Sequence, residues 1–420
     1  MDKIKIAIIG MGNRGRRYAY QIGQNPNAEI TAVCEKNPAH LYAAAERYGV
    51  KKENAFLSDT EFFKRGKLAD ALVIATQDRD HYGHAIAALN AGYQLLLEKP
   101  VSPIPSECEE IAALAHEKNL QVVVCHVLRY SAFYDTIKRV IDSGAIGEIL
   151  SINDIENVGY WHFSHSYVRG NWRNESETGP SILAKCCHDL DIIYYFSGKK
   201  CQEVFSSGSR KLFLRENAPD GATDYCLAPC PHRKTCAYDV KKIYYGITRH
   251  TIPKMGVHIK VITGMAKPKL KDLKEVLKTS PYGRCVYKCD NDVMENQNVA
   301  LCLDGGVSAN LTMTAFSRGC FRRLCISGTK GEIIGIDGEG KFRLNIFGGV
   351  SKTVKVSSGG IFGHLGGDRM IVSDFIEFLR TGIAPARLSA IDVTLESHRI
   401  AFAAEESRKT GKAVKLKVES

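Results

Sequence analysis

The chain has 420 residues, of which 44% are hydrophobic and 25% charged, and its formal net charge is +11. Because this length exceeds one comfortable hydrophobic core, two domains are expected. No run of about 18 apolar residues occurs, so a membrane-spanning protein is not expected. The first residues lead into a strand without a signal-peptide pattern, which favours a cytoplasmic, reducing compartment for the 14 cysteines.

Residues 1–125 alternate between apolar, strand-like runs and helical stretches. Strands are expected at 4–9, 29–34, 70–75, 93–97 and 120–125, and helices at 14–25, 39–48, 81–91 and 106–118. Alternating strands and helices pack as a parallel sheet with right-handed crossovers. This segment is therefore predicted to be a doubly wound α/β Rossmann domain.

Residues 126–420 follow a different pattern. Helices are expected at 133–143, 181–196, 368–379 and 390–409, and short strands at 148–156, 299–303, 307–314, 323–328, 332–336 and 342–347. Successive short strands favour antiparallel pairing. We predict a C-terminal α+β domain with a large, mainly antiparallel open sheet, interrupted by an irregular insertion at about 208–290.

Three glycines follow the first strand and precede the first helix. Gly10 permits a tight turn, Gly12 lets a pyrophosphate approach the backbone, and Gly15 allows close packing of helix and strand. The N-terminus of the helix would face the phosphates, and Arg14 would add a phosphate contact. An ordinary glycine turn is the alternative, but the strand–turn–helix context favours dinucleotide binding.

Glu35 ends the second predicted strand. A carboxylate at this position accepts hydrogen bonds from the adenosine ribose diol and repels a 2′-phosphate, which favours NAD over NADP. Arg16, Arg17 and Lys36 lie nearby in the sequence and weaken this preference. The alternative for Glu35 is a solvated turn residue.

Glu98, Lys99 and Pro100 close the apolar run 93–97. Ligands of open parallel sheets bind outside the carboxyl ends of the strands, so Lys99 is expected to face the binding cleft. The segment from Thr76 to His81 follows the preceding strand and is expected to form a loop beside the same cleft. Its alternative role is to begin a helix.

These motifs resemble those of the Gfo/Idh/MocA family (glucose–fructose oxidoreductase, inositol dehydrogenase and rhizopine catabolism). The resemblance covers nearly the whole chain and rests on residues 8–15, 74–76 with His81, 98–100, 148–149 and 410–414. It implies NAD(P)-dependent oxidation or reduction of a sugar, polyol or glycoside. It also implies a homodimer or homotetramer that packs through the C-terminal sheet.

The resemblance further implies the catalytic residues. Lys99 would lie near the nicotinamide and the reacting hydroxyl, and His188 matches a further family histidine. Family members commonly carry an aspartate four residues before that histidine, where this chain has Ala184 followed by Lys185. We predict that Lys99 orients the hydroxyl and that His188 or Lys185 exchanges its proton, with the two lysines lowering each other's pKa. A buried structural histidine is the alternative for His188.

Residues 157–173 are rich in aromatic and hydrogen-bonding side chains and contain both tryptophans. Such a segment suits a carbohydrate pocket, and a loop or subunit interface with aromatic anchors is the alternative. Residues 363–368 are expected either to close over this pocket or to begin a helix capped by Asp368. The predicted cofactor-binding residues are Gly10, Gly12, Asn13, Arg14, Gly15, Glu35, Thr76, Gln77, His81, Glu98, Lys99 and His126. The predicted substrate residues are Tyr160, His162, His165, Arg169, Trp172 and Asp191.

The insertion at 208–290 holds 17 lysines and arginines against seven acidic residues. It contains no recognised nucleic-acid motif, so we expect a solvated basic surface and no nucleic-acid partner. Its closely spaced thiols suggest a structural Zn²⁺ site that would staple the loop. The expected ligands are Cys226, Cys230, Cys236 and one of Cys285 or Cys289, preferably Cys289, with His232 as a substitute. An iron–sulfur cluster and free thiols are the alternatives.

Three functions are compatible with these observations. The leading hypothesis is an NAD-dependent sugar, polyol or glycoside dehydrogenase. A second is a glycoside hydrolase that oxidises its substrate transiently with bound NAD to permit elimination. A third is a ligand-sensing protein that reuses the dinucleotide fold, although a sensor needs no paired proton-transfer groups.

Overall fold

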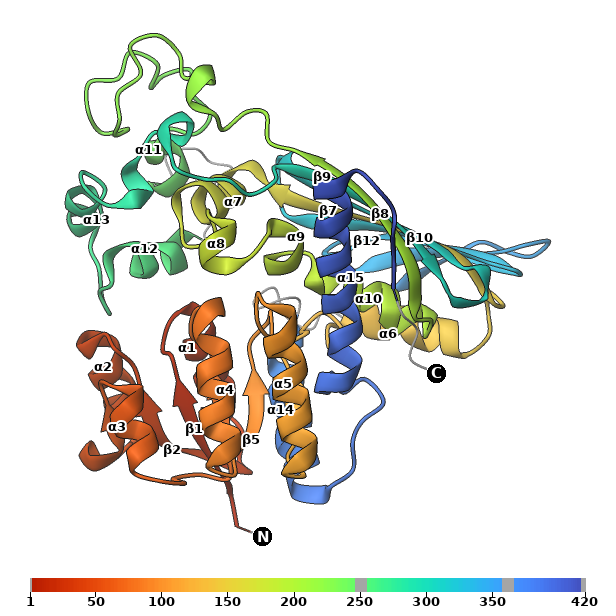
Figure 1. The fold of residues 1–420 in the computed structure, drawn as a ribbon, viewed down its shortest axis with the longest axis horizontal. Helices are drawn as coiled ribbons and strands as arrows, with labels where there is room; N and C mark the ends of the chain where they lie inside the picture. Colours follow the sequence, from red (N-terminus) through yellow and green to blue (C-terminus); the bar gives the residue numbers. More distant parts are fainter. Residues whose placement is uncertain (1, 246–254, 357–365, 417–420) are drawn as a thin grey trace.

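The computed structural model describes residues 2–245, 255–356 and 366–416, arranged as two sheet-based domains (Figure 1). The first sheet is parallel, in the order β3-β2-β1-β4-β5-β6. This confirms the doubly wound first domain. Its strands are β1 (Ile4–Ile9), β2 (Ala28–Cys34), β3 (Ala55–Phe56), β4 (Ala71–Ile74), β5 (Gln94–Leu97) and β6 (Val122–Val124).

Helices flank this sheet at the positions that the hydrophobic pattern predicts. They are α1 (Asn13–Gly23), α2 (Pro38–Tyr48), α3 (Asp59–Lys64), α4 (His81–Asn90) and α5 (Pro105–Glu117). Helix α2 shows the local reasons well: the Asn37 side chain caps its first turn, Pro38 opens it, and Gly49 ends it in the left-handed conformation.

The second sheet has nine strands in the order β14-β13-β12-β11-β7-β10-β9-β8-β15. Only the pair β7 and β10 is parallel among the described pairs, so the sheet is mainly antiparallel as predicted. Its strands are β7 (Ile149–Gly159), β8 (Cys201–Ser209), β9 (Asn296–Leu303), β10 (Ser308–Ser317), β11 (Phe321–Gly328), β12 (Gly331–Ile336), β13 (Lys341–Ile346), β14 (Lys352–Lys355) and β15 (Val414–Lys415).

Helices α6 (Ala132–Asp142), α10 (Cys187–Ser197) and α15 (Ile391–Thr410) cover one face of the second sheet (Figure 1). The predicted helix at 181–196 is in fact two, because α9 (Ser181–Ala184) ends before α10 begins. The break falls at Lys185 and Cys186. It therefore lies within the segment that carries the predicted catalytic residues.

Helix α14 (Gly367–Thr381) returns from the C-terminal part of the chain to the first domain. Its Ile371, Val372 and Phe375 belong to the same buried cluster as Ile6 and Ile8 of β1. Gly366 occupies the N-cap, so Asp368 lies inside the first turn rather than capping it. Residues 363–365 of the proposed closing segment lie outside the described residues.

The insertion is more regular than its sequence suggests. It contains α11 (Val240–Tyr244), α12 (Met255–Thr263) and α13 (Leu270–Val276). These helices share a small buried cluster formed by Trp161, Val240, Ile243, Tyr244, Ile262, Leu273 and Leu277. Apolar packing therefore holds these three helices together.

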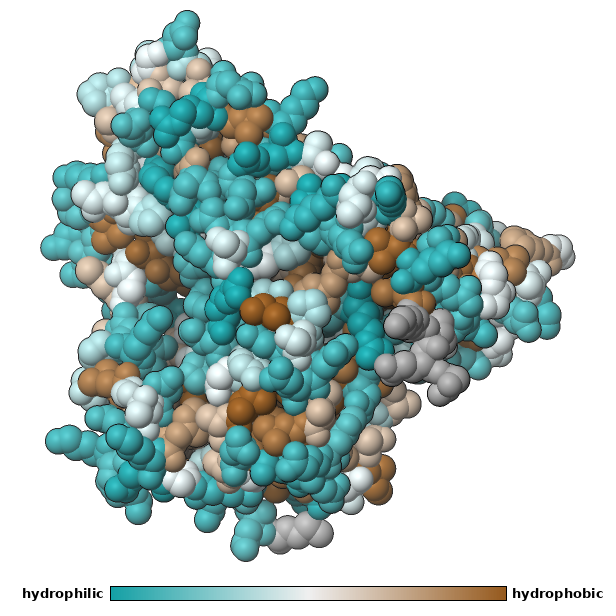
Figure 2. All heavy atoms as spheres, in the orientation of Figure 1, coloured by the Kyte–Doolittle hydropathy of each residue, from teal (hydrophilic) through white to brown (hydrophobic). Residues whose placement is uncertain are grey.

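No helix in the described ranges is both long and apolar enough to span a membrane. The face shown in Figure 2 is mostly hydrophilic, with small, separated hydrophobic areas.

Candidate active site

The glycine turn after β1 has the geometry of a dinucleotide grip. Gly10 has φ +89°, and a Cβ there would lie 2.5 Å from the Ala75 carbonyl oxygen; a Cβ at Gly15 would lie 1.8 Å from the Gly10 carbonyl oxygen. Both positions therefore require glycine. Beside Gly12 nothing lies within 4 Å of where a Cβ would stand. This open space lies at the start of α1, next to Asn13, where backbone N–H groups can receive a pyrophosphate.

Glu35 ties the glycine turn to the loop that follows β2. Its carboxylate accepts hydrogen bonds from the backbone N–H groups of Met11, at 2.6 Å, and Asn37, at 2.8 Å. A carboxylate held at this place can serve the ribose diol of an adenosine. The residues present therefore fit NAD.

Arg14 turns toward the protein rather than toward the open space. It pairs with Glu98 (Nε–Oε1 2.5 Å) and with Asp368 of α14 (Nη2–Oδ1 2.7 Å). Burial acts to raise the pKa of Glu98, but the charges of Arg14 and Lys99 lower it below its ordinary value. Arg14 thus keeps the residue before Lys99 ionised and connects it to α14.

Lys99 lies at the end of β5 and reaches the second domain. Its Nζ donates a hydrogen bond to the carbonyl oxygen of Ala184 at 2.7 Å. In a continuous helix this carbonyl would accept from the N–H of His188. The break between α9 and α10 therefore provides the acceptor that holds Lys99.

Three histidines surround this point. The His126 ring, just after β6, lies edge-on to the rings of His188 and His398, with centroids 5.6 and 6.1 Å away. His188 lies in the first turn of α10 and is 5% exposed. Burial, with the charges of Arg129 and Lys99, lowers the pKa of His126 well below its ordinary value. Within the described residues neither ring nitrogen of His126 has a hydrogen-bond partner.

Lys185 forms an ion pair with Glu156 of β7, Nζ to Oε1 at 3.1 Å. Burial acts most strongly and lowers its pKa, but the charges of Glu156, Cys320 and Asp189 together raise the pKa above its ordinary value. The prediction that two lysines would lower each other's pKa is therefore wrong for Lys185, because a buried carboxylate neutralises its charge.

The loop after β4 meets the aromatic segment of the second domain. The Trp172 Nε1–H donates to Asp78 at 2.9 Å, and Gln77 accepts from the side chain of Asn171 at 3.2 Å. Burial raises the pKa of Asp78, against the charges of His81 and Lys99. The structure thus brings Trp172 beside the predicted cofactor loop.

Two other residues of that loop are held by neighbouring groups. His81 makes a hydrogen bond to the carbonyl oxygen of Pro100 at 2.7 Å, and the Thr76 hydroxyl contacts His84 Nδ1 at 3.1 Å. These contacts link the loop to the segment after Lys99 and to helix α4.

The other predicted substrate residues lie in different surroundings. Arg169 is buried and donates to the carbonyl oxygens of Arg284 and Tyr238. His165 stacks on Tyr282 with centroids 4.8 Å apart. Asp191 forms a buried bidentate pair with Arg129, and Tyr160 and His162 are half-buried. Arg169 and His165 therefore connect the aromatic segment to the insertion.

The cysteines of the insertion do not support the zinc prediction. Among the residues that the structure describes, no group of three or more His, Cys, Asp or Glu side chains is arranged to hold a metal ion. Cys226 accepts from Arg169, and His232 contacts the carbonyl oxygen of Asp220. Burial raises the pKa of Cys236 and raises that of Cys289 to about 11. All five candidate cysteines, Cys230 and Cys285 included, are free thiols.

Three residues around Lys99 gave no signal in the sequence: His398 lies far along the chain, and Glu156 and Arg322 look like ordinary strand residues of alternating exposure. Asp368 is expected near the pocket or at a helix cap, but its pairing with Arg14 is not. Only the chain path brings them to the site. Tyr18, which donates to Glu98 at 2.5 Å, could have been found from its position one helical turn after Arg14.

The parallel sheet, the glycine turn at the start of α1 and the cleft at the strand ends define a Rossmann-type nucleotide-binding fold. The family model "Oxidoreductase family, NAD-binding Rossmann fold" matches residues 4–126, and "GFO/IDH/MocA C-terminal domain" matches residues 134–228. The chain belongs to the Gfo/Idh/MocA family.

Curated relatives are similar over part of their length. Inositol 2-dehydrogenase of Salmonella paratyphi B is 25% identical over 204 residues, covering 48% of this chain and 56% of the relative. The 2,7-anhydro-N-acetylneuraminate hydratase of Escherichia coli is 22% identical over 206 residues, covering 49% and 52%. The chain thus matches about half the length of each.

A solved structure of levoglucosan dehydrogenase in complex with NADH and levoglucosan has a TM-score of 0.72. It is 17% identical and covers 99% of both chains. At this identity the similarity shows a shared fold.

Proposed function

We propose that the chain is an NAD-dependent oxidoreductase that acts on a hydroxyl-bearing carbon of a sugar, polyol or glycoside. The observation that carries this proposal is the position of Lys99, an amine at the carboxyl end of β5 anchored on Ala184 at 2.7 Å. It lies in the domain whose glycine turn has room for a pyrophosphate. When bound, NAD accepts or supplies the hydride.

The residues of the chain would hold the cofactor along the strand ends. Gly10, Gly12, Asn13 and Gly15 form the pyrophosphate end, and Glu35 the ribose end. Thr76, Gln77, His81, Glu98 and His126 form the nicotinamide end. Arg14 acts indirectly, because its charge is already paired with Glu98 and Asp368.

Proton transfer is assigned to His188, with Lys99 as the hydrogen-bond donor that orients the substrate hydroxyl. A histidine changes charge near neutral pH and so suits an acid/base role. Lys185 suits it less, because its pairing with Glu156 favours the protonated form. Trp172, Tyr160 and His162 remain the proposed substrate contacts. We assign positioning roles to the other three predicted substrate residues: His165 and Arg169 through their contacts with the insertion, and Asp191 through its pair with Arg129.

Replacing the proposed catalytic groups tests this assignment. The purified chain is mixed with NAD or NADP and a panel of polyols, sugars and glycosides, and reduced cofactor is measured. We expect turnover with NAD and a loss of about 10²- to 10⁴-fold in kcat for Lys99→Ala and for His188→Ala. Lys67→Ala is a matched control, because this exposed lysine precedes β4 at the opposite end of the sheet. Wild-type rates in Lys99→Ala would remove the amine from the chemistry.

The hydrolase alternative stays open because one relative is named a hydratase rather than a dehydrogenase. The same panel separates the two. Release of aglycone from a glycoside without accumulation of reduced cofactor would favour transient oxidation and elimination.

We further propose a homodimer or homotetramer in a reducing compartment such as the cytoplasm. The outer face of the second sheet supports the proposed assembly, because its apolar side chains are exposed: Ile155, Phe205 and Ile334 are 36%, 48% and 42% exposed. Strand register places all three on the face opposite the covering helices. The 14 free thiols are consistent with the proposed reducing compartment.

A further inference from the structure

Among the described residues, the insertion forms a hydrogen bond with the first domain at the loop that follows β2. The Asn37 side-chain amide donates a hydrogen bond to the carbonyl oxygen of Gly264 at 3.0 Å. Gly264 follows α12 directly and has φ +65°, a left-handed conformation that favours glycine. In Figure 1, α12 accordingly lies over the side of the first domain that carries α2.

Asn37 has its other polar groups engaged within the cofactor site. Its side-chain oxygen caps α2 by accepting from the N–H groups of Ala39 and His40. Its backbone N–H donates to Glu35, whose second oxygen accepts from Met11 of the glycine turn. One chain of hydrogen bonds therefore runs from the glycine turn to the insertion.

The insertion end of this chain is anchored by packing. Ile262 of α12 is 7% exposed and belongs to the apolar cluster with Leu273 of α13 and Trp161. Trp161 belongs to the same aromatic segment as Trp172, which meets the loop after β4. The apolar core of the insertion therefore holds α12 in place beside Asn37.

Groups of both charges lie around the loop at residues 35–37. Arg16 approaches His40, with Nη1 and Nε2 3.5 Å apart, and also donates to the carbonyl oxygen of Met11. Burial and the charge of Arg16 lower the pKa of His40, Glu35 opposes them, and Lys260 of α12 adds to the lowering. The positive charge of Lys260 therefore acts on His40 at the ribose end of the site, where an anionic nucleotide would lie.

We propose that the insertion is part of the cofactor site: α12 and Gly264 close over the loop at residues 35–37, so that the adenosine end of a bound dinucleotide is enclosed between them, with Lys260 as a cationic wall. This rests on the proposed function, since it assumes that the groove binds a dinucleotide. Release of the cofactor then requires breaking the contact between Asn37 and Gly264. The insertion acts chiefly on the dissociation rate.

The test measures NADH release directly, without turnover. NADH bound to the purified chain is displaced by excess NAD⁺ in a stopped-flow fluorimeter. Asn37→Ser keeps a residue that caps α2 but is too short to reach Gly264. We expect its dissociation rate to rise about three- to tenfold, as for loss of one hydrogen bond, with the association rate changed less than about twofold. Lys260→Ala should also release NADH faster, and exposed Lys267→Ala serves as its control.

Gly264→Ala perturbs the same contact from the other side and covers the case in which Asn37→Ser destabilises α2. Release at the wild-type rate in a folded Asn37→Ser or Gly264→Ala variant overturns the proposal while leaving the proposed function intact. A wild-type chain that binds neither NADH nor NAD⁺ overturns the proposed function, and the inference with it.

Discussion

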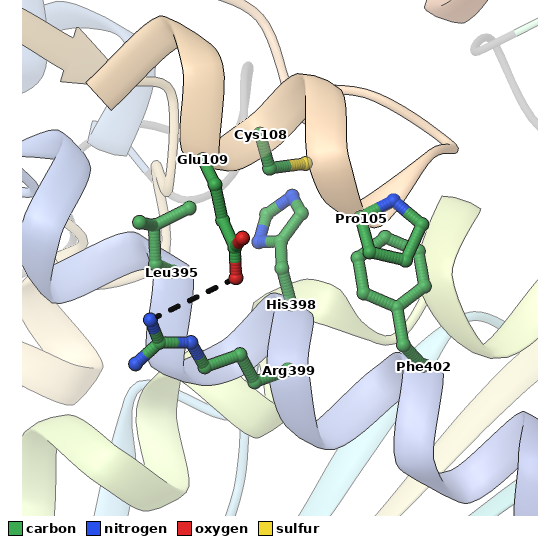
Figure 3. Close-up of a pocket in the computed structure, with 7 residues that line it drawn as sticks. All are labelled: Pro105, Cys108, Glu109, Leu395, His398, Arg399 and Phe402. Atoms are coloured by element: carbon green, nitrogen blue, oxygen red, sulfur yellow. Dashed lines mark ion pairs between the residues drawn. The ribbon is translucent and has the colours of Figure 1, made fainter. Parts of the chain in front are cut away.

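At the scale of single residues, His398 shows how a distant side chain positions the loop that carries Lys99. Its Nε2 accepts the N–H of Val101 at 2.9 Å and its Nδ1 contacts the Thr394 carbonyl oxygen at 3.2 Å. These two contacts select the neutral imidazole with its proton on Nδ1. In Figure 3 the ring borders a cavity of about 20 Å³ between α5 and α15, about the space of one water molecule.

The pH dependence of stability tests this arrangement. Burial and the neighbouring His126 lower the pKa of His398 to about 3, whereas an unfolded chain has the ordinary value of about 6.5. As the pH falls below that value, the unfolded state binds a proton that the folded state does not. The stability due to neutral His398 is therefore complete above about pH 6.5 and is lost as the pH falls toward 3.

Replacing His398 by Gln should make the free energy of unfolding depend less steeply on pH. The slope of unfolding free energy against pH between about pH 4 and pH 6 should decrease by up to about 1.4 kcal/mol per unit, the value for one proton. Urea unfolding of both proteins across this range measures the difference, in which groups common to both cancel. Parallel curves would show that His398 accepts a proton in the folded state.

At the scale of elements, one arginine joins three of them. Arg322 of β11 donates to Asp189 of α10 and pairs with Glu156 of β7, Nη2 to Oε2 at 2.8 Å. Asp154, also on β7, is buried and has no hydrogen-bond partner among the described residues. Burial and Asp189 raise the pKa of Asp154 well above its ordinary value. Arg322, together with Lys185, therefore supplies the positive charge that makes burial of Glu156, Asp189 and Asp154 possible.

Arg322→Met should destabilise the chain by about 3–5 kcal/mol, because it leaves Glu156 and Asp189 buried with less compensation. Arg65→Met is the control, because this exposed arginine follows α3 in the first domain, away from the acidic residues and from the outer face of the second sheet. Its stability should stay close to that of the wild type. Equal urea midpoints for the two variants would contradict a special role for Arg322.

The elements themselves were largely predictable. Strand and helix positions in the first domain follow from local hydrophobic period and from caps such as Asn37, which act within a few residues. The break in the helix at Lys185 was not predictable, because residues 181–196 carry a continuous helical pattern. It is stabilised by a contact from Lys99, which lies 85 positions away from Ala184.

At the scale of the whole molecule, the outer face of the second sheet predicts self-association. Ile155 lies near the middle of β7 on this face, among neighbours paired to it by register. Ile155→Glu would place a like charge from each subunit in a sheet-to-sheet interface. In sedimentation velocity we expect the wild-type protein to sediment as a dimer or tetramer. The Ile155→Glu variant should sediment with a mass close to that of one chain. A monomeric wild type would contradict the proposed assembly.

Local sequence alone determined the glycine turn, Glu35 just after β2, Lys99 just after β5 and the doubly wound class of the first domain, because each depends on neighbouring residues and on the alternation of strand and helix periods. The tertiary structure decided which groups meet: Arg14 with Asp368, His398 with Val101, Asn37 with Gly264. It also placed α14 in the first core. Such contacts join segments far apart in the chain, and no local pattern encodes their distance in space.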